Sequence, residues 1–169
     1  EITTRLVGSE MCIRDRIVFS LFKEMDYSGA MESLAGVFPY LAFLLSVFSA
    51  LRLAKFNNDT RQTSSFVGLP VPANALFWAS LVTGAHDWLV SSNFHPVYLL
   101  LLVCLFSWLL VSEIPMFSLK FKNLSWKDNK TSFIFLLVCI PFLIFLGICS
   151  FSAIIVWYIL LSLITRKSK

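Results

Sequence analysis

TSFIFLLVCIPFLIFLGICSFSAIIVWYILLSLIT, from Thr131 to Thr165, carries no charged residue, and this stretch decides the fold class. A helix needs about 20 mainly apolar residues to cross a membrane, whose hydrocarbon core is roughly 30 Å thick. One helix over the whole run would be about 52 Å long, at about 1.5 Å per residue. The run therefore predicts two shorter crossing helices, with a break near GICSFS, Gly147 to Ser152.

The composition of the whole chain is that of an integral membrane protein. Hydrophobic residues make up 57% of its 169 residues and charged residues 14%, with a mean hydropathy of +0.78. Soluble domains are nearer half apolar and about a quarter charged. The net charge of +4 is explained by the excess of Lys and Arg that membrane proteins keep in cytoplasmic loops. We therefore expect membrane lipid, and no nucleic acid, as a partner.

Charge distribution predicts how the chain crosses the membrane. The other expected spans are Ser33–Phe56, a helix that starts at Pro72 or Ala73 in the uncharged run Gln62–His86, and a helix that starts at Pro96 in the run Trp88–Ser112. Lys and Arg occur in the first and third connections and at the C-terminus, but not in the second connection. If basic loops are cytoplasmic, the uncharged run must cross an even number of times. We expect an all-α, polytopic membrane bundle of about five transmembrane helices, with a cytoplasmic C-terminus.

The first residues of the chain differ from the rest. EITTRLVGSEMCIRDR, residues 1–16, is polar, charged and without a clear period. It resembles the peptide obtained when sequencing-adapter DNA is read as protein, and the alternative is a flexible cytosolic tail. We expect native sequence to start near Ile17, so that IVFSLF, Ile17–Phe22, is the tail of an earlier helix. Residues 17–169 would then be the C-terminal part of a single membrane-embedded domain.

SALRLAKFNN, Ser49 to Asn58, ends the first apolar run with two cations. Helix residues three apart are neighbours, so Ser49, Arg52 and Lys55 should face one way. A cation at mid-bilayer costs about 2.5–3.5 kcal/mol on insertion scales, but near the interface its long side chain reaches water. The pair is therefore either a set of orientation anchors or an anion site for phosphate or carboxylate. Arg would offer such an anion a planar fork.

Glu113 is the other ionisable residue that the sequence singles out. It lies near the end of the third span, just before Pro115, at the depth expected for Arg52 and Lys55. Ionisable residues in spans are usually functional and have a partner. We expect an ion pair or support of a site, with an interfacial carboxylate as the alternative. His86 and His95 are expected to be solvated residues of the outer loop.

Three stretches carry a resemblance to a known family. SALRLAKFN, followed by GLPVPANA from Gly68 to Ala75, is similar to the C-terminal half of bacterial phosphatidylserine synthases, which are CDP-alcohol phosphatidyltransferases. VSEIPMFSLKFKNLSWKDNK, Val111 to Lys130, resembles the later loop of that group. The resemblance covers Ile17 to about Arg166. Many relatives have Arg where this chain has Lys55, so a bidentate contact at that position is lost.

The resemblance implies an activity and its partners. The hydroxyl of L-serine would attack the diacylglycerol-bearing phosphate of CDP-diacylglycerol and give phosphatidylserine and CMP, with Mg²⁺ or Mn²⁺ on the diphosphate. We expect Ser49, Arg52, Lys55 and Asn57 to bind the serine carboxylate or the reacting phosphate. The resemblance further implies a homodimer and the bacterial inner membrane.

The catalytic motif of the family is missing from this chain. That motif has the form D-x-x-D-G-x-x-A-R-x8-G-x3-D-x3-D, and it supplies the metal ligands and the general base. The aspartates here are Asp15, Asp26, Asp59, Asp87 and Asp128, of which no two are three or four apart and none precedes Gly. We expect the motif upstream of Ile17 in the whole protein, and we expect this chain alone to be inactive. The alternatives are a sibling transferase with another acceptor alcohol, and a non-catalytic membrane subunit or transporter.

Overall fold

Helices make up almost all of the described chain. The computed structural model describes the backbone of residues 2–27, 29–58, 66–91, 94–116 and 130–167, and the side chains in these ranges except those of residues 2–10, 29–31, 57–58, 66–67, 115, 130–131 and 166–167. The elements in chain order are α1 (Ile2–Glu24), η1 (Gly29–Leu34), η2 (Phe38–Phe43), α2 (Leu44–Asn58), β1 (Phe66–Val67), α3 (Val71–Val90), α4 (Pro96–Val111), β2 (Pro115–Met116), α5 (Lys130–Leu146), η4 (Gly147–Cys149) and α6 (Ser150–Lys167). The predicted all-α class is confirmed, with a pair of two-residue strands added.

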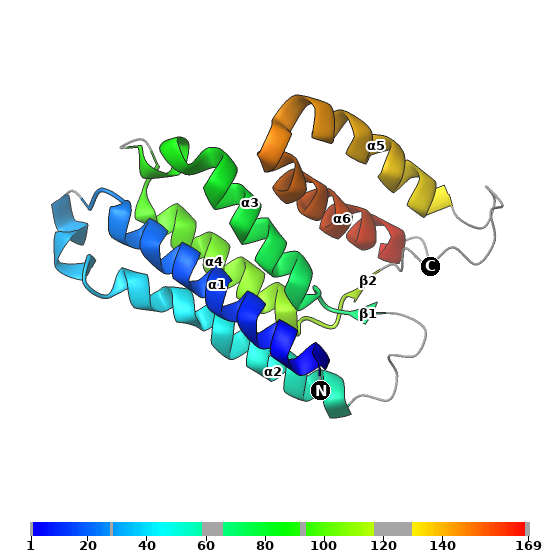
Figure 1. Cartoon of the computed structure of the whole chain (residues 1–169), viewed down its shortest axis with the longest axis horizontal. Helices are drawn as coiled ribbons and strands as arrows, with labels where there is room; N and C mark the ends of the chain where they lie inside the picture. Colours follow the sequence, from blue (N-terminus) through cyan, green and yellow to red (C-terminus); the bar gives the residue numbers. More distant parts are fainter. Residues whose placement is uncertain (1, 28, 59–65, 92–93, 117–129, 168–169) are drawn as a thin grey trace.

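The long uncharged run folds back on itself as a hairpin. α5 ends at Leu146, a short 3-10 turn follows, and α6 returns antiparallel to α5 (Figure 1). Gly147 makes the reversal with a φ of +55°, a conformation that glycine adopts without strain. The Ser150 hydroxyl then donates to the Gly147 carbonyl (2.5 Å) and closes the turn. The break lies within the GICSFS stretch where the length of the run predicts it.

Two helical stretches of the described chain are long and apolar enough to cross a membrane. They are Phe38–Phe56, formed by η2 and most of α2, and Ser132–Thr165, which is the hairpin. Pro96–Val111 is apolar but shorter. Much of the hairpin surface is exposed and apolar: Leu137, Ile144 and Phe145 are 66%, 73% and 84% exposed. An apolar surface of this extent marks contact with a membrane or a partner protein.

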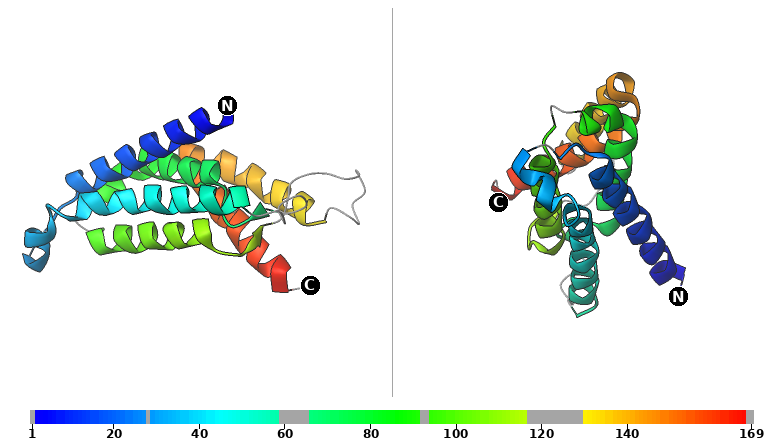
Figure 2. Two further views of the ribbon diagram at one scale, coloured as in Figure 1. Left: turned by 90° about the horizontal axis from the view of Figure 1, so that it is seen from below. Right: turned by 90° about the vertical axis from the view of Figure 1, so that its left-hand side faces the viewer.

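One end of the bundle gathers the cations at the end of α2, the start of α5 and the end of α6. α2, α4 and α6 end there, and α1, α3 and α5 begin there (Figures 1 and 2). We call it the basic end, because Lys55 is in the last turn of α2, Lys130 begins α5 and Lys167 ends α6. The uncharged run thus starts and finishes at the same end, as its flanking charges predict.

α1 joins the suspected non-native residues to the expected helix tail. Residues 2–24 form one helix, in which Val18, Leu21 and Phe22 are buried against α3 and η2. The Tyr27 hydroxyl donates to the Phe22 carbonyl (2.8 Å), and burial raises the pKa of Tyr27 to about 12. The hydroxyl therefore stays protonated as a donor at neutral pH. The prediction that Ile17–Phe22 ends a helix is confirmed, whereas the origin of residues 1–16 stays a prediction.

A short two-stranded pairing closes the basic end. Val67 pairs with Pro115 in the β1–β2 ladder, and Gly68 N–H donates to the Ile114 carbonyl (2.9 Å). Gly68 has a φ of +75°, and a Cβ there would lie 2.8 Å from the Ser112 carbonyl oxygen and 2.9 Å from that of Leu110. Only glycine fits both the backbone conformation and the space.

We expect Gly68→Ala to destabilise the fold by about 1–3 kcal/mol, because it adds a strained conformation and a clash with backbone. Thermal unfolding in detergent micelles measures this loss. Gly36→Ala is the matched control, since Gly36 has open space around its Cα and no positive φ. Equal midpoints for the two variants would show that the β1–β2 closure does not constrain Gly68.

Candidate functional site

The stripe formed by Ser49, Arg52 and Lys55 does not converge on one partner. Ser49 is fully buried, Arg52 is half-buried, and Lys55 is 37% exposed at its side chain. Helix positions three apart differ by about 60° in direction, so six residues turn the helix face by about 120°. The expectation that all three face one way is therefore wrong for Ser49 and Lys55: Ser49 meets α1, and Lys55 meets the end of α4.

Ser49 meets a buried ion pair on α1. Arg14 is 1% exposed and Asp15 3%. The Arg14 guanidinium donates to the Asp15 carboxylate from Nε (2.9 Å) and Nη2 (2.7 Å), and from Nη1 to the Ser49 hydroxyl (2.9 Å). Ser49 itself donates to the Leu45 carbonyl (2.7 Å), and the Ser46 hydroxyl donates to Asp15. The hydroxyl of Ser49 is thus engaged within the protein, and its contact with a substrate stays a prediction.

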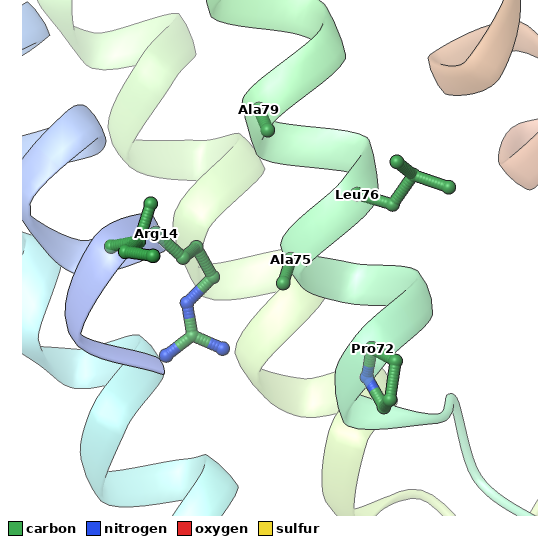
Figure 3. A pocket seen from close by; sticks show the side chains of 6 residues that line it. Arg14, Pro72, Ala75, Leu76 and Ala79 are labelled. Carbon is green, nitrogen blue, oxygen red and sulfur yellow. The ribbon is translucent and has the colours of Figure 1, made fainter. Parts of the chain in front are cut away.

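A groove runs beside this ion pair between α1 and α3. Its volume is about 350 Å³, and Ile13, Arg14, Pro72, Ala75, Leu76 and Ala79 line it. Figure 3 shows Arg14 on the α1 side and the small residues Pro72, Ala75 and Ala79 on the α3 side. The wall is apolar except for Arg14, whose donors already meet Asp15 and Ser49. The groove therefore suits an apolar chain better than a charged ligand.

Lys55 pairs with Glu113 at the basic end. Its ammonium donates to the carboxylate (2.9 Å) and to the Val111 carbonyl (3.5 Å). Glu113 was expected to pair with Arg52 or Lys55, and the structure brings it to Lys55. This pair joins the end of α2 to the end of α4, so Lys55 is already neutralised by the protein.

We expect this pair to contribute little stability, because its side chains are 37% and 69% exposed. The coupling energy of Lys55→Ala and Glu113→Ala in a double-mutant cycle should be about 0.2–1 kcal/mol. It should fall further in 1 M salt, where the screening length is about 3 Å. A coupling several times larger and insensitive to salt would mean that the pair is effectively buried.

Hydrogen bonds fix the relative levels of α2 and α4. The Lys55 ammonium lies 3.5 Å from the carbonyl of Val111, the last residue of α4, so the last turns of the two helices lie near each other. Arg52 lies three residues, about 4.5 Å, before Lys55 along α2, and Ser107 lies four residues, about 6 Å, before Val111 along α4. Arg52 and Ser107 therefore lie within about one turn of the same level, near the basic end.

α3 brings Asn74 to this level. Leu69 N–H donates to the Leu109 carbonyl (3.1 Å), so the start of α3 lies beside the end of α4. Phe77 stacks on Phe106 with the ring centroids 4.0 Å apart. Asn74 lies about 4.5 Å from Phe77 toward the basic end, and Ser107 about 1.5 Å from Phe106 in the same direction. Asn74 and Ser107 are both fully buried. They approach the interior from two helices at one level.

α6 adds Tyr158 from the other side of α3. The Ser152 hydroxyl donates to the Phe77 carbonyl (3.0 Å), and α6 runs antiparallel to α3 (Figure 1). Tyr158 lies about 9 Å beyond Ser152 toward the basic end, and Asn74 about 4.5 Å beyond Phe77 in the same direction. Tyr158 is therefore within about one turn of Asn74. Tyr158 also interacts electrostatically with the Arg52 guanidinium.

We call Arg52, Asn74, Ser107 and Tyr158 the polar layer. Arg52 Nε, both amide atoms of Asn74 and the Ser107 hydroxyl are buried and find no hydrogen-bond partner among the described residues. Buried polar groups in native proteins nearly always have a partner. The layer thus offers donors, acceptors and one cation to a small polar molecule, and it is the candidate site.

Sequence reasoning named only Arg52 of this layer. Asn74 stands within GLPVPANA, where Gly and Pro gave the stronger signal of a helix start. Ser107 and Tyr158 lie in almost uniformly apolar helices, which have no marked polar face. A single polar residue inside an apolar span was the available signal, and it does not say which interior residues share a level.

Two further predictions concern side chains near the ends of helices. Asn57 lies in α2, but its side chain is outside the described residues. His86 was expected in a loop, but it lies in a helical stretch that follows a kink at Ala85 and continues to Val90. His86 Nε2 lies 2.8 Å from the Glu24 carboxylate on α1. His95 is exposed at the start of α4, where its Nδ1 accepts from Val97 N–H (3.4 Å).

The described residues do not fit the metal that the resemblance implies. Mg²⁺ and Mn²⁺ prefer oxygen ligands such as grouped carboxylates. No three His, Cys, Asp or Glu side chains of the described ranges lie close enough to hold one ion. Asp15, the buried carboxylate on α1, is engaged by Arg14. We therefore derive no reaction step through a metal from these residues.

Comparisons of the chain with family models, with curated proteins and with solved structures gave no match.

Proposed function

We propose that this chain is the C-terminal part of a CDP-diacylglycerol–serine phosphatidyltransferase. The observation that carries the proposal is the meeting of the three stretches that resemble that family. Lys55 of SALRLAKFN contacts Glu113 of VSEIPMF, and Gly68 of GLPVPANA contacts Ile114 of the same segment. Their meeting at one end of the bundle supports a single site built from stretches that are far apart in sequence.

In this proposal the polar layer binds the acceptor side of the reaction. The serine hydroxyl forms a bond to the phosphorus of CDP-diacylglycerol, and the bond from that phosphorus to the oxygen of CMP breaks. Arg52 would bind the serine carboxylate or a phosphate oxygen, because its planar guanidinium matches either group. Lys55, held by Glu113, would keep the ends of α2 and α4 together. The general base belongs to the aspartate motif that we expect upstream of Ile17.

The same proposal places the protein in a membrane. The two membrane-length apolar stretches and the gathering of cations at one end support a multi-pass protein with the basic end in the cytoplasm. The bacterial inner membrane and a homodimer follow from the resemblance alone. The groove beside Arg14 would then face lipid chains.

Reading the source DNA upstream of the Ile17 codon tests the proposal first. We expect an in-frame D-x-x-D-G-x-x-A-R pattern within about two helices. The protein expressed from the longer gene should release CMP from CDP-diacylglycerol only when L-serine is present. Release with another alcohol instead would establish a sibling transferase. Phosphatidylserine formation by the 169-residue chain alone would contradict its expected inactivity.

A non-catalytic membrane subunit or transporter is the second candidate. The buried Arg14–Asp15 pair favours it, because ionisable groups inside a bundle often mark transport pathways. Its level is that of Ser49, further from the basic end than Arg52. No CMP release by the longer protein, with any acceptor alcohol, would favour this candidate.

A further inference from the structure

Asn74 is the polar residue of the bundle whose position is hardest to explain by folding alone. Its side chain is fully buried, and neither its Nδ2 nor its Oδ1 has a hydrogen-bond partner among the described residues. Its own N–H donates to the Pro70 carbonyl (3.1 Å), so the backbone needs nothing from the side chain. An isosteric leucine would fill the same space without burying an unsatisfied amide. A binding role explains why an amide occupies this position.

The polar residues at about the level of Asn74 indicate what it could bind. At its level the polar layer offers the buried Ser107 hydroxyl, also without a partner among the described residues, and the half-buried Arg52. Arg52 is a fixed cation that suits a carboxylate. Asn74 Oδ1 is an acceptor, and Nδ2 supplies two donors. A molecule with a carboxylate at one end and an ammonium or hydroxyl at the other would satisfy both residues.

We propose that Asn74 recognises the ammonium group of an amino-acid acceptor, while Arg52 binds its carboxylate. This inference rests on the proposed function and assigns a specificity-determining residue to it. The Asn74 Oδ1 accepts a hydrogen bond from the ammonium, and the acceptor hydroxyl stays free to react. Asn74 therefore sets the preference for serine over a hydroxy acid that lacks the ammonium.

Binding measurements on the 169-residue chain in detergent micelles test this assignment. The probes are L-serine, 3-hydroxypropionate, which lacks the ammonium, and ethanolamine, which lacks the carboxylate. Isothermal titration should show that the chain binds L-serine at least tenfold more tightly than either analogue. Asn74→Leu should weaken L-serine binding at least tenfold and change 3-hydroxypropionate binding less than twofold. Ser80→Ala, a buried α3 change at a hydroxyl that is bonded to Ser152, should leave all three affinities within twofold.

Thermal unfolding separates a binding effect from a folding effect. Asn74→Leu should unfold at the wild-type temperature or above it, because the change removes an unsatisfied amide. If this variant does not fold, Asn74→Gln gives the same test, since its amide is displaced by one methylene. A folded variant should lose the preference for serine over 3-hydroxypropionate.

The outcomes distinguish the inference from the proposed function. Wild-type serine affinity in Asn74→Leu overturns the role of Asn74 and leaves phosphatidylserine synthesis standing. A wild-type chain that binds none of the three probes also overturns the role of Asn74. CMP release by the longer protein tests the proposed function independently of this result. A preference for ethanolamine that depends on Asn74 overturns the pairing with Arg52 and the choice of serine together.

Discussion

Asp15→Ala should destabilise the protein by about 3–5 kcal/mol, because it leaves the Arg14 guanidinium buried without its anion. Arg14 is 1% exposed, and two of its three hydrogen bonds go to Asp15. The Ser49 hydroxyl that remains cannot neutralise the charge. Folded proteins are typically stable by only about 5–15 kcal/mol. We therefore expect a large loss of folded material on size-exclusion chromatography in detergent.

A double variant shows whether the charge causes this loss. Arg14→Met combined with Asp15→Leu removes both charges and keeps most of the volume, so it should be as stable as the wild type. Asp26→Ala is the surface control, since Asp26 is exposed, and it should change stability by less than about 0.5 kcal/mol. An Asp15→Ala protein as stable as the Asp26→Ala protein would mean that Arg14 reaches water in solution.

The helical hairpin could be predicted from the length of the uncharged run and from the cations that flank it, because membrane thickness and the cytoplasmic preference of cations apply to membrane proteins in general. The uncharged run from Thr131 to Thr165 is too long for one crossing of the membrane, and the cations at both of its ends require an even number of crossings. The structure has that hairpin, broken at Gly147. The boundary expected at His86 coincides with a kink at Ala85, where φ is −127° and ψ is 22°, but a second helical stretch then continues to Val90. His86 in that stretch meets Glu24, which is 62 residues away in the sequence.

Charged residues were the hardest to place from the sequence. Arg14 and Asp15 were set aside with residues 1–16, because that stretch is polar, has no clear period and resembles sequencing-adapter DNA read as protein. The two charges neutralise each other and form hydrogen bonds with the hydroxyls of Ser49 and Ser46 on α2, so the segment that carries them can be buried. The local sequence shows the two charges, but it does not show that serines more than 30 residues away form hydrogen bonds with them. The same limit hid the polar layer, whose members come from four helices.

Replacing Arg52 by Ala in the longer, active protein should raise the serine KM by roughly 10- to 150-fold. A hydrogen bond to a charged group is worth about 1.5–3 kcal/mol, and each 1.36 kcal/mol corresponds to about tenfold. Arg52 is half-buried, and its Nε finds no partner among the described residues, so the side chain is poised for an anion. Steady-state CMP release at varied serine concentration measures the change.

Lys55 provides the matched control for Arg52, because both cations lie on the last turns of α2 but only Lys55 has a carboxylate partner in Glu113. Lys55→Ala should therefore change the serine KM less than about fivefold, the factor that corresponds to the upper limit of about 1 kcal/mol for a weak exposed ion pair. Arg52→Lys should fall between Ala and the wild type, since it keeps the charge and loses the planar fork. If Arg52→Ala and Lys55→Ala insert normally and both leave the KM unchanged, the two cations orient the helix in the membrane and bind no substrate. If Lys55→Ala has the larger effect, the anion binds at the exposed basic end, and the polar layer is not the acceptor site.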